Sequence, residues 1–419
     1  MQRFKFILLL CFLSTTCAYA DVDTKPGIFD SRFRTLETRL EGNFYAPAVI
    51  PLVGEDRIAI SFDEIGEERS YLRYSLVHCN ADWQPSSLVD AEFIDDFNEG
   101  KIEDYEYSQL TKTHYTHYSL FIPNDDMRPT KSGNYLLRVY DESDPDRTLL
   151  QTRFMVSEYS MKINAEVTSR TDVDYNEHNQ QLSIAVDIER SPVQNIMSDL
   201  RVRVEQNGRL DNAVLLSRPS RFSGKTAYYE HLRPLIFPAG NEYRRVEFTS
   251  VTIPMLCVEH IDYFEPFYHI TLRSDEIRAT QPYAYDQTQH GRFLIREYDS
   301  SQSEIEADYV AVHFSLPTDE IEGYDLFLDG DFTCRRFDPD SRMVYNRVFN
   351  AYEATPLLKQ GAYNYQILAV PNGENIGLTD VIEGDKYQTV NEYVIAVYYR
   401  RSDERYDRLT STATIYSGT

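Results

Sequence analysis

Short segments in which apolar and polar residues alternate run from one end of this chain to the other. They include Arg57–Phe62, Tyr71–Val77 and Leu182–Ile188, and clusters of Pro, Asn, Asp and Gly separate them. A period of two is the signature of a β-strand, and such turn clusters are typical of antiparallel sheets. The pattern predicts an all-β fold of tandem immunoglobulin-like antiparallel β-sandwich domains. Only Phe33–Leu40 has the spacing of a short helix.

Two polar joints divide the series of expected strands into three units of similar length. Ser157–Ser160 separates the first series from the second, and Ser300–Glu304 separates the second from the third. Residues 21–158, 159–300 and 301–419 are each long enough for one sandwich. We therefore expect an N-terminal, a middle and a C-terminal β-sandwich domain.

Residues 1–20 have the pattern of a secretory signal peptide. Two basic residues precede the apolar run Phe6–Leu13, and Ala18-Tyr19-Ala20 is an A-x-A cleavage site. This apolar run is too short to cross a bilayer, which takes ~20 residues. No later run approaches that length, so we expect export without direct membrane insertion. Cys17 leaves lipidation as an alternative, although the residues before it do not form a lipobox.

The chain is strongly acidic, with 67 Asp and Glu against 42 Lys and Arg and a net charge of −25. Loss of the export segment, whose only charges are Arg3 and Lys5, changes this value to −27. Nucleic acids and anionic lipid surfaces both attract basic proteins, so we expect neither as a partner. An apolar fraction of 42% and an aromatic fraction of 13% are too high for a disordered acidic chain.

One segment, Asp90–Tyr107, is more acidic than the rest and carries eight acids and one Lys. The first expectation is a long solvated loop on the first domain. Clustered carboxylates also suit Ca²⁺, although their spacing matches no EF-hand loop. Long loops on rigid sandwiches often contact partners. The sequence leaves these three roles open.

Three cysteines follow the export segment, namely Cys79, Cys257 and Cys334. Their wide spacing fits neither a disulfide scaffold nor a CxxC-type metal site. We expect buried thiols that pack as small apolar residues. One disulfide and one free thiol is the alternative.

No catalytic arrangement emerges from the sequence, which contains neither G-x-S-x-G nor H-E-x-x-H. His114 and His117 are three positions apart in an expected strand, so their side chains point to opposite faces and do not chelate one metal. We expect both to be surface or half-buried histidines. His78 and Cys79 are adjacent, which separates their side chains in the same way. We therefore expect no enzymatic activity, no cofactor and no metal.

The stretch His78–Ser86 (HCNADWQPS) contains the single Trp of the chain, and other unusual stretches follow it in order. They are Tyr115–Tyr118, Ser132–Tyr135, Phe237–Arg245, Asp308–Val310, Leu358–Tyr365, Asn391–Tyr393, Val397–Arg400 and Arg405–Leu409. Taken in this order, they resemble the type 9 secretion system plug protein, a periplasmic family of Bacteroidetes bacteria.

The resemblance implies a non-enzymatic role. A plug of this kind closes the periplasmic mouth of the outer-membrane translocon barrel while no substrate is engaged, and we expect a monomer bound one to one on the inner side of that membrane. Asn80, Asp82 and Trp83 are candidate partner-contacting residues. Their alternative role is structural, with Trp83 in a sandwich core and Asn80 and Asp82 bound to turn backbone.

A different function also fits part of the sequence. A carbohydrate-binding or carbohydrate-processing sandwich of the periplasm or cell surface would use some of the 32 Tyr as stacking platforms. Most of these Tyr are expected in strands and cores instead. Binding to a glycan panel would distinguish the two functions.

Overall fold

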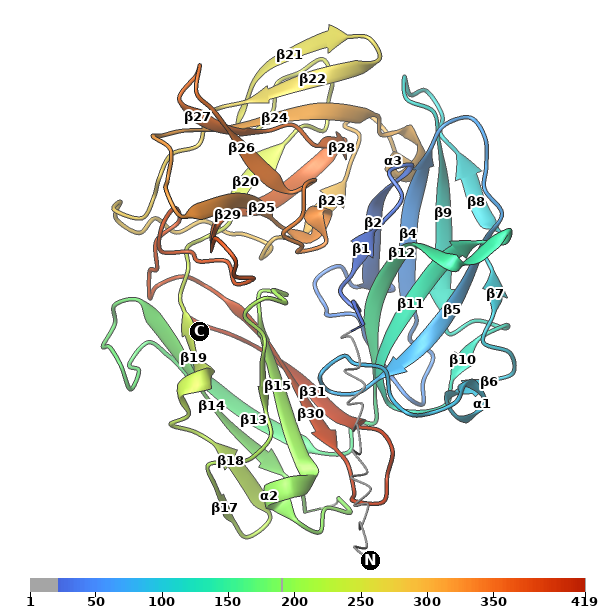
Figure 1. Cartoon of the computed structure of the whole chain (residues 1–419), viewed down its shortest axis with the longest axis vertical. Helices are drawn as coiled ribbons and strands as arrows, with labels where there is room; N and C mark the ends of the chain where they lie inside the picture. Colours follow the sequence, from blue (N-terminus) through green and yellow to red (C-terminus); the bar gives the residue numbers. More distant parts are fainter. Residues whose placement is uncertain (1–21, 190, 419) are drawn as a thin grey trace, which may run out of the picture.

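The computed structural model describes residues 22–189 and 191–418, and most of its regular elements are β-strands. The strands form three lobes arranged around a common centre (Figure 1). The predicted all-β sandwich class is confirmed. The expected export segment, residues 1–20, lies outside the described residues. Within the described ranges, no helix has the length and apolar character that crossing a membrane requires.

The first lobe is a sandwich of two sheets around one hydrophobic core. One sheet has the order β1 (Gly27–Ile28), β12 (Asp144–Ser157), β11 (Gly133–Asp141), β5 (Leu72–Cys79) and β7 (Gly100–Lys101), and β3 (Val49–Pro51) joins β12 in parallel. The facing antiparallel sheet has the order β2 (Phe33–Leu40), β4 (Ile58–Ile65), β9 (Tyr115–Ile122) and β8 (Asp104–Tyr107). Phe62 of β4, Leu76 of β5 and Tyr135 of β11 point inwards from these sheets and are buried between them.

The short helix expected at Phe33–Leu40 is wrong, because this segment is strand β2, paired with β4. The register shifts between Arg34 and Glu37, and Thr35 has a φ of 54°. Such a bulge inserts an extra residue and breaks the period of two. Phe33 and Leu36 are consequently both buried although they are three positions apart, and this spacing imitates a helix.

The acidic segment Asp90–Tyr107 is more ordered than the expected long loop. It contains the helical turn α1 (Asp90–Phe93) and the strands β6 (Ile94–Asp95), β7 and β8, and β6 pairs with β10 (Arg128–Pro129). Phe93 and Ile102 are buried in the core of the first lobe. Among the described residues, no group of three or more His, Cys, Asp or Glu side chains is arranged to hold a metal ion.

The second lobe is built from two stretches that are far apart in the sequence. One sheet has the order β13 (Lys162–Thr168), β14 (Asn179–Asp187), β18 (Thr226–Tyr229) and β17 (Arg221–Ser223), and β19 (Ile236–Pro238) pairs with β14. The facing sheet has the order β16 (Val214–Leu216), β15 (Leu200–Gln206), β30 (Glu392–Tyr399) and β31 (Arg408–Tyr416). The short helical elements α2 (Ile196–Asp199) and η1 (Arg233–Leu235) connect strands. Val202 of β15 and Ile395 of β30 lie in one core.

The third lobe is one path of strands that closes around its own core. The order is β20 (Arg244–Glu247), β29 (Gly361–Pro371), β25 (Tyr324–Asp329), β26 (Arg342–Asn346), β27 (Ala351–Ala354), β24 (Tyr309–Pro317), β22 (Phe267–Leu272) and β21 (Val258–Phe264). Beside this path lie β23 (Phe293–Ile295), β28 (Leu357–Lys359), α3 (Ser303–Glu306) and the 3₁₀ turn η2 (Asp331–Thr333). Val246 of β20 and Ile270 of β22 share one core although they belong to opposite parts of the path.

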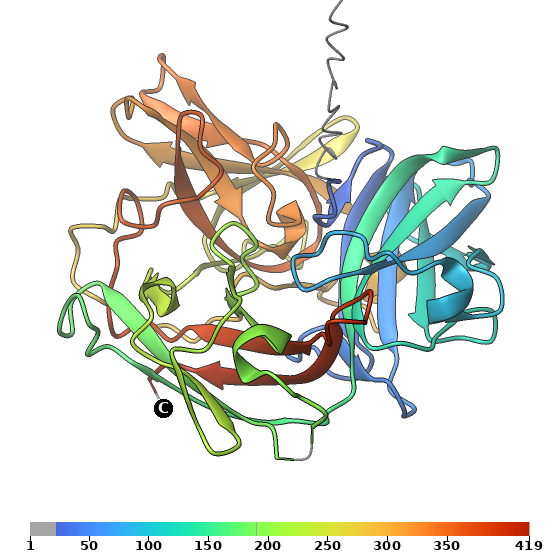
Figure 2. The same cartoon turned by 60° about the horizontal axis from the view of Figure 1, so that its bottom comes forward.

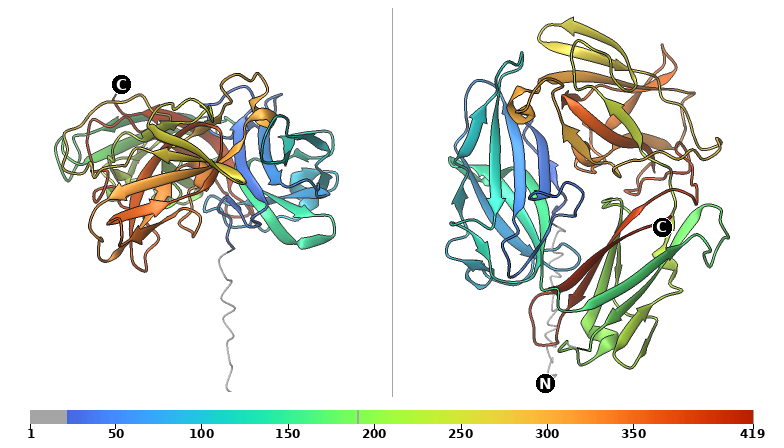
Figure 3. Two further views of the ribbon diagram at one scale, coloured as in Figure 1. Left: turned by 90° about the horizontal axis from the view of Figure 1, so that it is seen from above. Right: turned by 180° about the vertical axis from the view of Figure 1, so that it is seen from behind.

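Strand pairing divides the chain differently from the predicted units 159–300 and 301–419. The strands between residues 244 and 295 pair within the third lobe, whereas the C-terminal hairpin β30–β31 completes the second lobe (Figures 2 and 3). The polar joint near residue 300 leads into α3 and lies inside the third lobe. From this pairing we propose three lobes made of 22–158, of 159–243 with 391–418, and of 244–390.

Candidate functional site

The predicted site residues Asn80, Asp82 and Trp83 form a turn after β5. Asp82 Oδ1 accepts a hydrogen bond of 3.0 Å from the backbone N–H of Gln84, as expected for a turn. Trp83 is 4% exposed and packs with Cys79. The Arg153 guanidinium lies 4.3 Å from the centre of the Trp83 ring. Both side chains therefore have structural roles, and a partner contact by this turn stays a prediction.

Asn80 connects the turn to the C-terminal hairpin of the second lobe. Its Oδ1 accepts hydrogen bonds from Arg400 Nη2 at 2.5 Å and from the backbone N–H of Asp407 at 3.2 Å. In return, Asp407 Oδ2 accepts a bond of 3.0 Å from the N–H of Ala81. The conformation of this turn and the docking of the hairpin are thus mutually dependent.

The same junction contains ion pairs and a small apolar cluster. Asp407 contacts Arg201 of β15 and lies 2.8 Å from Nε of Arg400. Tyr398 donates a hydrogen bond of 2.8 Å to Asn134 of β11 and packs in a buried cluster with Ala81. One face of β30 therefore faces the core of the second lobe while the other face lies against the first lobe, and every residue of this strand is buried.

A fully buried polar network joins the first lobe to the third lobe. The carboxylate of Asp63, on β4, receives three contacts of 2.6 Å, from His117 Nδ1, Tyr309 Oη and Lys359 Nζ. The Asp63 and Lys359 side chains have no exposed surface. Lys359 Nζ also donates to the carbonyl of Glu304 at 2.5 Å. The charges are thus paired and hydrogen-bonded, as burial requires.

The neighbours of Asp63 decide its ionisation. Burial alone would raise the pKa of Asp63, but Lys359 and His117 together hold it below its ordinary value. For His117 burial acts in the opposite direction and would lower the pKa, but the hydrogen bond to Asp63 keeps it above its ordinary value. An ionised Asp63 between two cationic partners is the arrangement that this geometry favours.

Further hydrogen bonds at the same boundary involve backbone groups. The Asp308 carboxylate accepts bonds of 2.8 and 3.0 Å from the N–H groups of Lys112 and Thr113. The Tyr115 hydroxyl donates a bond of 2.8 Å to the carbonyl of Ala307. Each of these bonds links the first lobe to the third. Backbone groups at this boundary are therefore hydrogen-bonded across it, as they are inside a domain.

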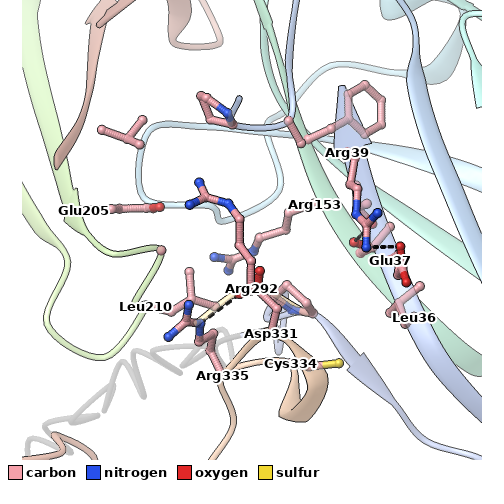
Figure 4. A pocket seen from close by; sticks show the side chains of 18 of the residues that line it. Leu36, Glu37, Arg39, Arg153, Glu205, Leu210, Arg292, Asp331, Cys334 and Arg335 are labelled. Atoms are coloured by element: carbon pink, nitrogen blue, oxygen red, sulfur yellow. Dashed lines mark hydrogen bonds and ion pairs between the residues drawn. The ribbon is translucent and has the colours of Figure 1, made fainter. Parts of the chain in front are cut away.

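A cavity of about 240 Å³, here called the junction cavity, lies where the three lobes meet (Figure 4). Its lining includes Leu36, Phe44 and Trp83 from the first lobe, Leu210 and Val394 from the second, and Phe293 from the third. Charged residues lie among these apolar groups. Glu37 is paired with Arg39, and Arg292 lies 2.7 Å from Glu392. Burial outweighs the Arg39 charge and raises the pKa of Glu37 to about 7.

Comparison with known proteins extends this picture. The family model of the type 9 secretion system plug protein first domain matches residues 33–158. The crystal structure of a hypothetical protein from Parabacteroides merdae ATCC 43184 is 40% identical and superimposes with a TM-score of 0.93. That match covers 94% of this chain and 100% of the other. The chain belongs to the type 9 secretion system plug protein family.

More remote comparisons add no information. Collagen adhesin from S. aureus is 7% identical, with a TM-score of 0.14 over 93% of this chain and 94% of the other. The native conformation of E. coli alpha-2-macroglobulin is 9% identical, with a TM-score of 0.18 over 93% of this chain and 34% of the other. Scores this low carry no argument about fold. No curated protein matches the chain.

The first-domain model of the plug family coincides with the first lobe, since it begins at β2 and ends at the joint after β12. The stretches that resemble this family also lie at the lobe boundaries. Asp308, Tyr309 and Lys359 hold the boundary between the first and third lobes, and Asp407 holds that between the first and second. In this chain, several of the recognised stretches serve to fix the lobes to one another.

Sequence reasoning missed two residues at these boundaries and misjudged a third. His117 was expected at the surface or half-buried, but it is 8% exposed and bound to Asp63. Asp63 and Arg153 carried no local signal, because their partners lie hundreds of residues away or on another strand. Asp63 follows Phe62 at a position where the alternation predicts a polar, outward-facing residue, so nothing in the local pattern marked it as buried.

Within the described residues, Cys79, Cys257 and Cys334 are the cysteines, and all three are free. Cys79 is buried as expected, whereas Cys257 and Cys334 are partly exposed. Burial raises the pKa of the Cys79 thiol to about 12. This thiol is therefore kept protonated near neutral pH, which is the opposite of what nucleophilic catalysis requires.

Proposed function

We propose that this chain is a non-enzymatic periplasmic plug that seals the periplasmic opening of the type 9 secretion system translocon channel while no substrate is engaged. Family membership supports this role. The observation that carries the proposal is a pair of ionic junctions that fix three sandwiches into one body. The junction around Asp63–Lys359 is fully buried, and the junction around Asp407 is partly buried. A body that closes a wide channel must resist deformation, and paired charges at the lobe boundaries oppose relative movement of the lobes.

A plug must also be displaceable. We expect its contact with the channel to be moderate in area and polar, because obligate interfaces are large and apolar. The net charge of −25, or −27 after loss of residues 1–20, favours a basic or hydrogen-bonding rim on the partner. If retention of the chain on the purified barrel is unchanged between low and high salt, this electrostatic contribution is absent.

The sealing role can be tested by measuring leakage through the channel. A strain lacking this chain should admit a large, normally excluded antibiotic, and wild-type complementation should restore exclusion. Affinity purification of the tagged chain from detergent-solubilised envelopes should recover one very large outer-membrane protein in a one-to-one ratio. Unchanged permeability together with recovery of the monomer alone would reject the proposal. Saturable binding to a glycan panel in the same preparation would favour the carbohydrate alternative.

A further inference from the structure

One cation in the junction cavity has no carboxylate within ion-pair distance among the described residues. The lining arginines Arg39, Arg292 and Arg335 each contact a Glu or an Asp. Arg153 instead donates from Nε to the carbonyl of Thr24 at 2.6 Å and from Nη2 to the Thr24 hydroxyl at 2.9 Å. Its Nη1 has no partner within the described part of the chain.

The surroundings make this charge costly to hold. Burial is the main cause that lowers the pKa of Arg153 to about 10, and repulsion by Arg203 is the second. Glu205 attracts it, but the nearer partner of Glu205 is Arg203, at 2.8 Å. Arg153 is half-buried. A cation that has lost part of its hydration and has no counter-ion is unfavourable, and an anion placed beside it would offset that cost.

The shape of the cavity adds a second requirement. The Trp83 ring fixes the plane of the Arg153 guanidinium from one side, and Thr24 fixes two of its nitrogens. The wall also contains Leu36, Phe44 and Phe293. A volume of about 240 Å³ accepts a molecule of roughly ten non-hydrogen atoms, below the usual range of drug-sized pockets. The site therefore suits a small apolar body carrying one negative group.

We propose that the junction cavity binds a small organic carboxylate, with the carboxylate on Nη1 of Arg153 and an apolar body against Leu36, Phe44 and Phe293. Carboxylates match guanidinium donors in both charge and geometry. Because all three lobes line the cavity, a bound molecule stabilises their joint arrangement by mass action. This inference goes beyond the sealing role and does not depend on it.

The test uses 3-phenylpropionate as the probe and the neutral 3-phenylpropionamide as its matched control. Calorimetric titration of the purified chain should give saturable binding of the acid, with a concentration-dependent rise in thermal midpoint. The amide should bind about tenfold more weakly, because it lacks the charge-assisted hydrogen bond. Equal affinity for acid and amide, or no saturable binding of the acid up to millimolar concentration, would overturn the proposal.

Three variants locate the site. Arg153→Gln should weaken binding of the acid about tenfold and leave binding of the amide almost unchanged. Ala46→Phe, which adds bulk to the cavity wall and leaves Arg153 in the sequence, should abolish binding of both probes. Arg147→Gln, an exposed position on the same strand β12, should bind like the wild type. Unchanged affinity in Ala46→Phe would place the acid elsewhere and reject the proposal, even if Arg153→Gln does not fold.

Discussion

Asp63 of β4 and Lys359 of β28 form a fully buried ion pair across the boundary between the first and third lobes. Their side chains have no exposed surface, and Nζ lies 2.6 Å from the carboxylate. His117 and Tyr309 occupy further positions around the same carboxylate. Such a pair contributes little net stability over apolar residues of equal volume, but breaking it leaves an uncompensated buried charge. Its geometry therefore specifies how the two lobes fit together.

Removal of one partner should reveal this asymmetry. Lys359→Met should lower the free energy of unfolding by ~3–5 kcal/mol, because Asp63 stays buried without its main counter-charge. Urea unfolding followed by circular dichroism measures the change. The double variant Asp63→Asn with Lys359→Met should recover part of the loss. Lys162→Met, at an exposed position on β13, is the matched control, and a loss no larger than that of the control would refute the role of the buried pair.

The Asp63 network should also make stability depend on pH. The pKa of Asp63 is lowered on folding, so its contribution is present above the ordinary value of 3.8 and is lost as the pH falls below it. The pKa of His117 is raised, so its contribution is complete below 6.5 and is lost as the pH rises beyond that value. Urea midpoints measured from pH 3 to 9 should show both losses. His117→Asn should flatten only the alkaline loss, and an unchanged alkaline slope would contradict the assignment to His117.

Glu37 should act in the opposite sense to Asp63. Its pKa rises from 4.5 to about 7 on folding, so the folded chain retains a proton that the unfolded chain has lost. Stability therefore falls as the pH rises through this range. Glu37→Gln should become more stable relative to the wild type by about 3 kcal/mol between pH 4 and pH 8. A constant difference between the two proteins over this range would show that Glu37 is ionised throughout.

The junction between the first lobe and the C-terminal hairpin is tested at Asp407. Asp407→Asn should reduce stability by ~3 kcal/mol, because Arg201 and Arg400 lose their shared counter-charge in a mostly buried site. Limited proteolysis should then cut the loop between β30 and β31 faster. The matched control is Asp403→Asn in the same loop, whose pair with Arg401 is exposed to solvent and should contribute little. Equal effects of the two substitutions would argue against the junction.

Thiol labelling should order the three cysteines by their surroundings. With Ellman's reagent, Cys257 should react first in the native protein, because Cys79 is fully buried and burial raises the pKa of Cys334 to about 12. Cys79 should react only after unfolding in urea. Cys257→Ser should remove the fast phase. Rapid labelling of Cys79 in native protein would show that the turn at Trp83 opens.

Alternating segments and turn clusters were sufficient to predict the fold class, because a strand's period of two is written locally in the sequence. Ordered stretches such as His78–Ser86 were sufficient to recognise the family, which the family model over residues 33–158 confirms. The same local method failed at Phe33–Leu40, where the bulge at Thr35 places Phe33 and Leu36 on one buried face. A bulge is a property of the pair of strands, and its position is not visible in one strand alone.

Sequence alone determined that this chain is acidic and β-rich, since composition and periodicity depend on near neighbours. Tertiary structure alone decided which stretches complete which lobe. It pairs Leu200–Gln206 with Glu392–Tyr399, and it brings Asp63 to Lys359 and Arg153 to Trp83. These contacts join residues from different strands, most of them far apart along the chain. Their specificity comes from burial and charge pairing in three dimensions, and local periodicity carries no record of either.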